Sequence, residues 1–333
     1  MSQNHIYEIL PDGTWEFFLD NSTLRTFVEC EAKFYERNLR NGTGIVPKGE
    51  GSWSVSLGSW WSSVMELFYT AMQRRELTRS LAMEAALHCW EKHELNKFSQ
   101  SKKFQSFGGP NGAVVMIGRY YDSFAELHQQ NWRIIAVEKT FGNKRAVPVG
   151  CSYTHGNGGF KVFWTGKPDL FIEDLTENRL MPIDHKTRDR IDRDAQVMYK
   201  PHPQTAGYIF AGNVIVKQLG WDRKIDRCII NLAARTEPSD NPRDGKPKPR
   251  FLHIYPQYSD EEIEEWRQQV LLKVASLKRA IETDEFRWNE SACHLYAGCG
   301  YRGIHSVKPS SRPVIIESCY TEAKPWMPYE EDE

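Results

Sequence analysis

The feature that most constrains this fold is residues 160–187, FKVFWTGKPDLFIEDLTENRLMPIDHKT. Residues 161–173 mix aromatic, β-branched and apolar side chains, which are typical of a strand. Residues 174–179 are polar turn formers, and residues 180–186 form a second apolar run that ends in charges. The sequence therefore predicts a two-stranded hairpin in the core of an α/β domain.

Three charged side chains lie on this predicted hairpin. Residues two apart on a strand face the same side, so Asp184 and Lys186 point together. Asp169 on the first strand can face them if the two strands pair. Two carboxylates beside one ammonium are unfavourable unless a cation or ligand resolves the repulsion, and Mg²⁺ bound by oxygen atoms does so. The hairpin is a candidate metal site, with the carbonyl of His185 as a further ligand, and the alternative is a surface hairpin with solvated charges.

The order of these motifs resembles the PD-(D/E)XK nuclease superfamily, in its branch of RecB-like and AddB-like exonuclease domains of phages and bacteria. The residues that carry the resemblance are Gly166, Lys167, Pro168 and Asp169, then Ile183, Asp184, His185, Lys186 and Thr187, then Gln204 and Tyr208. The resemblance implies a restriction-endonuclease-like core and hydrolysis of DNA with Mg²⁺ or Mn²⁺. Asp169 and Asp184 would be metal ligands and Lys186 the catalytic lysine, while Gln204 and Tyr208 would contact DNA or the active site.

Two flanking segments extend the resemblance. Glu138 lies in a strand similar to the one that precedes the nuclease hairpin, and its carboxylate is expected either near the metal or in a structural salt bridge. Gly58 and Glu66 match a family helix, but Ser62 stands where the family commonly has a histidine near the metal. This departure leaves open a site with fewer protein ligands or with reduced activity.

The chain contains 7 cysteines. Cys30 lies on a predicted helix that resembles the opening helix of RecB-like domains. Cys293 and Cys299 lie in a segment similar to the C-terminal signature of iron–sulfur members, whose last cysteine is replaced by His305. The resemblance implies a [4Fe–4S] cluster held by Cys30, Cys293, Cys299 and either His305 or Cys319. Zn²⁺ suits three Cys and one His, and the third alternative is no metal, with cysteines that only pack.

The chain has no overall excess of basic residues, since its net charge is −1, so any DNA-binding surface must come from a local basic segment. Arg188, Arg190, Arg193 and Lys200 follow the hairpin, and in the family arrangement they would contact phosphates without reading sequence. The expected partner is therefore single- or double-stranded DNA without sequence specificity. The sequence has no Walker A motif, so unwinding would need a helicase or recombination protein.

The chain length permits one large domain. We expect a single nuclease domain over residues 1–333, with a mixed central sheet at about 131–235 flanked by helices. A helical insertion is expected at about 60–127, and a C-terminal helix with the cysteine segment at 259–320. No apolar run reaches the roughly 20 residues that span a bilayer, and the N-terminus lacks a signal peptide, so a cytoplasmic location and no membrane partner are expected.

The expected function is exonuclease action in DNA recombination, repair or phage DNA processing. The alternative is a DNA-binding scaffold subunit that keeps the nuclease fold but has weak or no turnover. A sequence-specific endonuclease is disfavoured because nothing in the chain resembles a module that reads bases.

Overall fold

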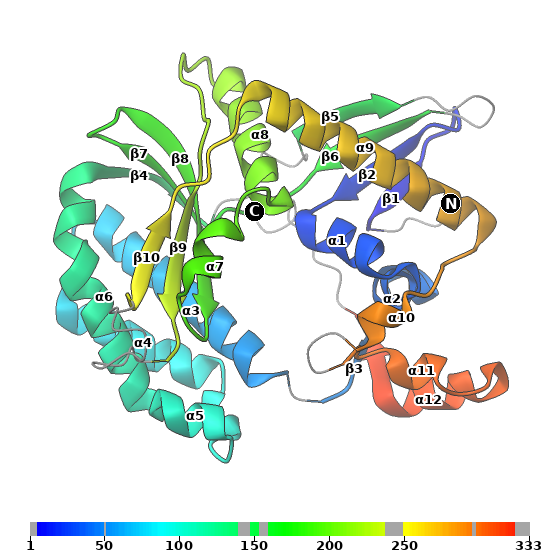
Figure 1. Cartoon of the computed structure of the whole chain (residues 1–333), viewed down its shortest axis with the longest axis horizontal. Coiled ribbons are helices and arrows are strands. Elements are labelled where there is room, and N and C mark those ends of the chain that lie inside the picture. Colours follow the sequence, from blue (N-terminus) through cyan, green and yellow to red (C-terminus); the bar gives the residue numbers. More distant parts are fainter. Residues whose placement is uncertain are drawn as a thin grey trace. The chain divides into compact units, whose positions relative to one another are not determined.

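The computed structural model describes residues 5–49, 51–138, 147–152, 159–236, 249–294 and 298–323 (Figure 1). They form two compact units, each assembled from segments that are distant in the chain. The hairpin unit comprises Gly51–Lys139 and Lys167–Asp260. The terminal unit comprises Met1–Glu50, Thr140–Gly166 and Glu261–Glu333.

The hairpin unit is built on a mixed five-stranded sheet in the order β10-β9-β8-β7-β4. Its strands are β4 (Trp132–Val137), β7 (Leu170–Asp174), β8 (Arg179–Arg188), β9 (Ile229–Ala234) and β10 (Phe251–Ile254). β8 and β9 are parallel, while the other neighbours are antiparallel. The predicted mixed α/β fold of the restriction-endonuclease-like type is confirmed, and so is the antiparallel pairing of β7 with β8.

Helices cover both faces of this sheet. The helices are α3 (Trp53–Gln73), α4 (Arg79–Lys92), η3 (Leu95–Phe98), α5 (Lys102–Phe107), α6 (Gly109–Asn131), α7 (Arg193–Val197) and α8 (Pro203–Gln218). The core contains residues of α3, α4 and α6 together with Leu170 and Ile183 of the sheet. On the opposite face, Gly212 of α8 lies against Phe171. Because Leu170 and Phe171 are adjacent on one strand, they point to opposite faces.

The tryptophan-rich stretch in α3 belongs to the apolar core of the hairpin unit. Trp60 and Trp61 are fully buried, and the Trp60 indole donates to the carbonyl of Ala86 at 2.9 Å. These two tryptophans therefore belong to the packed core rather than to an exposed surface. The Ser52 hydroxyl accepts a hydrogen bond from the Val55 amide and so caps the start of α3.

The prediction of one continuous strand over residues 161–173 is wrong. β6 (Phe160–Trp164) ends before Gly166 and pairs in parallel with β2 (Trp15–Leu19) in the terminal unit, whereas β7 begins at Leu170. Pro168 lacks an amide hydrogen and cannot donate to a sheet ladder, so the residues between the two strands break the pairing. β5 (Val147–Ser152) also belongs to the terminal unit's sheet, although it falls within the range expected for one core sheet.

The terminal unit contains two sheets. One has the order β1-β2-β6-β5, where β1 is Tyr7–Ile9, and the other pairs β3 (Ile45–Pro47) with β11 (Tyr320–Glu322). Its helices are α1 (Asn21–Glu29), α2 (Glu31–Phe34), η1 (Tyr35–Leu39), η2 (Arg40–Gly42), α9 (Asp260–Thr283), α10 (Glu290–Cys293), α11 (Arg302–His305), η4 (Pro309–Ser311) and α12 (Arg312–Cys319). Trp266 of α9 packs edge-on against Trp164 of β6, with ring centroids 5.1 Å apart. Val270, Val274 and Leu277 of α9 are also buried, so one face of this helix packs against the rest of the unit.

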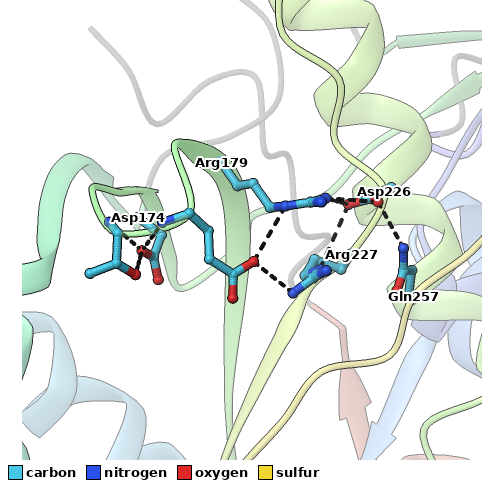
Figure 2. A network of polar contacts seen from close by, with 7 residues as sticks. Asp174, Arg179, Asp226, Arg227 and Gln257 are labelled. Carbon is cyan, nitrogen blue, oxygen red and sulfur yellow. Dashed lines mark hydrogen bonds and ion pairs between the residues drawn. The ribbon is translucent and has the colours of Figure 1, made fainter.

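A polar network fixes the turn of the β7–β8 hairpin, as Figure 2 shows. Arg179 Nη1 donates to both oxygens of Asp226 at 2.8 and 2.9 Å, and Arg227 donates to Glu177 at 2.9 Å. The Gln257 amide donates to Asp226 at 2.9 Å. These contacts tie the hairpin turn to the segments that precede β9 and follow β10, so they oppose a slip in the strand register.

Candidate active site

The register of the hairpin brings the two predicted aspartates together. Leu170 of β7 pairs with Ile183 of β8, so one residue further along the same register Asp169 lies opposite Asp184. Leu170 and Ile183 point into the core formed by α3, α4 and α6. Asp169 and Asp184 therefore point to the other face of the sheet, where α8 lies.

Lys186 completes this cluster. Its Nζ lies 2.9 Å from Asp184 Oδ1 and 2.7 Å from Oδ2, as expected for residues that share a strand face. The backbone amide of His185 donates to Asp169 Oδ2 at 2.5 Å. Both carboxylates are thus held by groups of β8, and Asp184 is only 2 % exposed.

Burial dominates the electrostatics of the three groups. It raises the pKa of both Asp169 and Asp184, because a charged carboxylate loses its hydration, while the Lys186 ammonium opposes this rise. Burial also acts to lower the pKa of Lys186, but the two carboxylates outweigh it and the net shift is upward. The cluster carries two acids for one base, so an additional cation would relieve an unfavourable charge balance.

Helix α8 places Gln204 and Tyr208 beside the cluster. Pro203 starts the helix at a position where a missing amide hydrogen costs nothing, and residues four apart share one helix face. The Gln204 amide donates to Asp184 Oδ1 at 3.2 Å and to the Tyr208 hydroxyl at 2.9 Å. Tyr208 in turn donates to the carbonyl of Lys167 at 3.2 Å. Burial raises the pKa of Tyr208 well above its usual range, so the phenol stays protonated.

Glu138 lies just beyond the end of β4 and joins the same cluster. Its backbone amide donates to the carbonyl of Asp169 at 3.0 Å, and its carboxylate pairs with Lys167 at 3.1 Å. Burial and the nearby Asp169 raise the pKa of Glu138 to about 7. Its φ of 49° is unusual for a residue with a side chain, which indicates local backbone strain at this point. The sequence alone allowed either a place near the metal or a salt bridge, and in the structure Glu138 contacts both Lys167 and Asp169.

The four predicted DNA-contacting residues are not equally placed. Arg188 follows the cluster on β8, and its Nη1 is buried without a hydrogen-bond partner among the described residues. Arg190 is exposed, and Lys200 lies over the Tyr258 ring, 5.0 Å from its centroid. The side chain of Arg193 lies outside the described residues. Within this set, Arg188 therefore has an unsatisfied donor, on the strand that carries Asp184 and Lys186.

Two features of the site were missed or only partly foreseen. Lys167 was recognised as part of a motif, but its contacts with Glu138 and Tyr208 follow no spacing rule in the sequence. On α3, a Cβ on Gly58 would lie 3.7 Å from Thr187 Oγ1, so this helix passes close to the end of β8. Ser62, one turn further on, is partly buried, while Glu66 is exposed and its charge contributes to the raised pKa of Glu138.

The candidate cluster ligands in the terminal unit are only partly assembled. Cys30 is buried in the break between α1 and α2 rather than inside one helix, and it packs against Ala292. Burial, then the neighbouring thiols of Cys299 and Cys30, raise the pKa of Cys293. Cys319 is exposed at the end of α12. Every cysteine whose side chain the structure describes is an unpaired thiol.

His305 is engaged elsewhere. Its Nε2 lies 3.5 Å from Glu36, and its ring stacks on Trp288 with centroids 5.4 Å apart. Among the described residues, no three Cys, His, Asp or Glu side chains are arranged to hold a metal ion by themselves. The described residues therefore give no support for a four-ligand cluster site. The hairpin carboxylates do fit Mg²⁺ or Mn²⁺, because such ions need one or two protein carboxylates and take their other ligands from water and phosphate.

Comparison with known families gives one family match. Residues 21–304 match the sequence profile of the PD-(D/E)XK nuclease superfamily, a range that includes every residue of the hairpin cluster. No curated protein matches the chain. Within the described part of the chain, no helix is both long enough and apolar enough to cross a membrane.

Proposed function

The chain belongs to the PD-(D/E)XK nuclease superfamily, and from this premise we propose that it is a metal-dependent nuclease that hydrolyses phosphodiester bonds in DNA. The observation that carries the proposal is the buried set of Asp169, Asp184 and Lys186 on one sheet face, with Gln204 hydrogen-bonded to Asp184. Two acids that share one lysine are typical of a site that is completed by a cation.

Each residue has a distinct proposed role. Asp169 and Asp184 would hold Mg²⁺ or Mn²⁺, with the His185 carbonyl as a further oxygen ligand. A bound ion of this kind polarises a phosphoryl oxygen and lowers the pKa of a bound water. Because the pKa of Lys186 is raised, its ammonium stays charged at neutral pH and stabilises the negative charge on the phosphate. In the reaction the water gives up a proton and its oxygen bonds to phosphorus, while the P–O bond to the departing sugar oxygen breaks and that oxygen takes up a proton.

Supporting residues fix the catalytic groups and the strand. Gln204 and Tyr208 orient Asp184 through a continuous set of hydrogen bonds that ends at the Lys167 carbonyl. Arg188 and the exposed Arg190 follow the cluster in the chain and would contact phosphate oxygens, and such contacts carry no sequence information. We therefore assign a single- or double-stranded DNA backbone as the substrate, without base recognition.

The mode and setting of the reaction are proposed from the resemblance to RecB-like domains. That resemblance favours an exonuclease in recombination, repair or phage DNA processing, with unwinding supplied by a separate helicase or recombination protein. The iron–sulfur or zinc site implied by the same resemblance is not part of the proposal, because His305 and Cys319 are not arranged with the other cysteines as a ligand set.

Cleavage of end-labelled linear and of covalently closed circular DNA tests the proposal. We expect Mg²⁺- or Mn²⁺-dependent release of nucleotides from linear DNA, and little attack on circles. Lys186→Ala should lose at least about a hundred-fold in kcat, because its ammonium contacts both oxygens of Asp184. Lys161→Ala is a matched control, since Lys161 pairs with a strand carboxylate, Glu16, at 2.9 Å in the terminal unit.

The outcomes separate the two candidate functions. Full activity in Lys186→Ala would remove the mechanism. Salt-sensitive DNA binding without metal-dependent cleavage by the wild-type protein would instead support the scaffold alternative, which the serine at position 62 favours.

A further inference from the structure

A buried polar chain lies behind the candidate active site, on the opposite face of the same sheet. The Asn231 amide of β9 donates to His185 Nδ1 at 2.9 Å and to the Tyr120 hydroxyl at 2.5 Å. The Tyr120 and Tyr69 hydroxyls are 2.7 Å apart, and Tyr69 is 3.0 Å from His128 Nδ1. The five residues come from β8, β9, α3 and α6, so this series of hydrogen bonds joins the sheet to the helices that cover it.

The hydrogen bonds of this chain have one consistent direction. Asn231 donates to the Tyr120 oxygen, which leaves the Tyr120 hydroxyl hydrogen for Tyr69. The Tyr69 hydroxyl then donates to His128 Nδ1. This direction requires a neutral His128, and burial lowers the pKa of that imidazole well below its usual range. Asn231, Tyr120 and Tyr69 are 0 % exposed, so a lost partner in this chain cannot be replaced by bulk water.

His185 connects this chain to the carboxylates. It lies between Asp184 and Lys186, and its ring points to the rear face, where Asn231 is its partner in the parallel β8–β9 register. The Tyr69 ring stacks on the His185 ring at 5.4 Å with an interplanar angle of 8°. The backbone amide of His185 donates to Asp169 Oδ2 at 2.5 Å. The ring and the amide belong to one residue, so contacts that fix the His185 ring also restrict the backbone that holds Asp169 and carries Asp184 and Lys186.

We infer that Asn231, Tyr120 and Tyr69 are positioning residues, which hold His185 from behind and so set the spacing of Asp169 and Asp184 for the divalent cation. This inference rests on the proposed function and adds residues to its site. None of the three touches the reacting atoms. Groups behind metal ligands that orient them change metal affinity or activity by roughly ten- to hundred-fold when removed.

Variants that remove one polar group while keeping shape test the inference. Tyr69→Phe deletes the hydroxyl that links Tyr120 to His128, and Asn231→Leu deletes both donations of the amide. We expect each variant to lower kcat and weaken Mn²⁺ binding by about ten-fold or more, with an unchanged KM for DNA. Mn²⁺ affinity is measured by titration calorimetry of the DNA-free protein, so this readout does not depend on turnover.

Tyr301→Phe is the matched control. Tyr301 is a buried tyrosine of the terminal unit, and its hydroxyl donates to the Ile45 carbonyl at 2.7 Å. It should lose thermal stability to a similar extent as Tyr69→Phe while keeping wild-type kcat and Mn²⁺ affinity. If Asn231→Leu does not fold, Tyr69→Phe alone decides.

Wild-type kcat and Mn²⁺ affinity in Tyr69→Phe would overturn the inference, and so would a change in KM alone. Absence of cleavage by the wild-type protein would count against the proposed nuclease function but not against the positioning role. In that case the Mn²⁺ affinities of the wild type, Tyr69→Phe and Tyr301→Phe still decide it.

Discussion

At the scale of single residues, the candidate site holds charge at the expense of stability. Asp169 has its pKa raised by burial, so its ionised form is less favourable in the fold than in the unfolded chain. Asp169→Asn keeps the size and an oxygen that can accept the His185 amide hydrogen. We expect cleavage to be lost and the free energy of unfolding in EDTA to rise by about 1 kcal/mol, as measured by urea unfolding. A lower free energy of unfolding than the wild type would contradict this charge account.

The partly buried His253 predicts a pH dependence of stability with a defined sign. Burial, then the nearby His185, lower the pKa of His253 to about 4, against about 6.5 in an unfolded chain. A depressed folded pKa means that the contribution is complete above pH 6.5 and is lost as pH falls toward 4. The loss is at most about 1.4 kcal/mol per pH unit within this window.

Urea unfolding of the wild type and His253→Phe at several pH values between 7.5 and 4.5 measures this contribution. The difference between the two proteins isolates His253 from the acids, whose raised pKa values act in the opposite direction. Phenylalanine is a suitable replacement because His253 already stacks on Phe124, with centroids 4.5 Å apart. Identical pH profiles for the two proteins would exclude this role for His253.

At the scale of elements, the hairpin turn is a structural anchor that is separate from the chemistry. Arg179→Ala removes the paired hydrogen bonds to Asp226 seen in Figure 2. Because Arg179 is 38 % exposed, we expect a loss of no more than about 1 kcal/mol that shrinks at high salt, with an unchanged kcat. Urea unfolding at low and high NaCl measures the loss, and Lys224→Ala, which breaks a more exposed pair with Asp260, should show less. A fall in kcat would mean that the turn controls the site.

The strands show which features of the fold could be predicted from the sequence and which could not. The period of two along β8 correctly placed Asp184 and Lys186 on one side, because pleating alone fixes it. The sequence pattern wrongly predicted β6 and β7 as one strand. Both segments are apolar, so the pattern does not show that they belong to different sheets. Only tertiary pairing of β6 with β2 reveals this difference. The local sequence pattern thus predicts the side of a strand on which a side chain lies, but it does not predict the sheet to which the strand belongs.

At the scale of the whole molecule, the parts of the site that could be predicted depend on local sequence patterns, and the other parts depend on tertiary packing. Strand periodicity placed Asp184 and Lys186 on one side and allowed Asp169 to face them, whereas Gln204 and Tyr208 were implied by the resemblance to the nuclease superfamily. The rear chain from Asn231 to His128 could not be predicted, because its members meet only after four elements have packed. His185 was assigned a role through its carbonyl alone, whereas its ring is the part with buried partners.

The last prediction concerns the terminal unit and the contacts that join its segment around Glu36 to its segment around His305. Glu36 is 3 % exposed and is paired with both Arg40 and His305. Tyr301 bonds to the Ile45 carbonyl, and β3 pairs with β11. These contacts already join the segments that a metal cluster was expected to join. We therefore expect His305→Ala to lower the free energy of unfolding by about 1 to 2 kcal/mol, because a buried carboxylate loses a partner.

Cys293→Ser is the matched variant, since Cys293 lies in the same segment and would be required by any cluster. It should leave the free energy of unfolding nearly unchanged, and anaerobically purified wild-type protein should contain neither iron nor zinc in stoichiometric amount. Metal analysis, the visible absorption spectrum and urea unfolding of the two variants measure this together. Stoichiometric iron, with a large loss of stability in Cys293→Ser, would show that a cluster holds the segment, and His305 would then have to leave Glu36 or be replaced by Cys319.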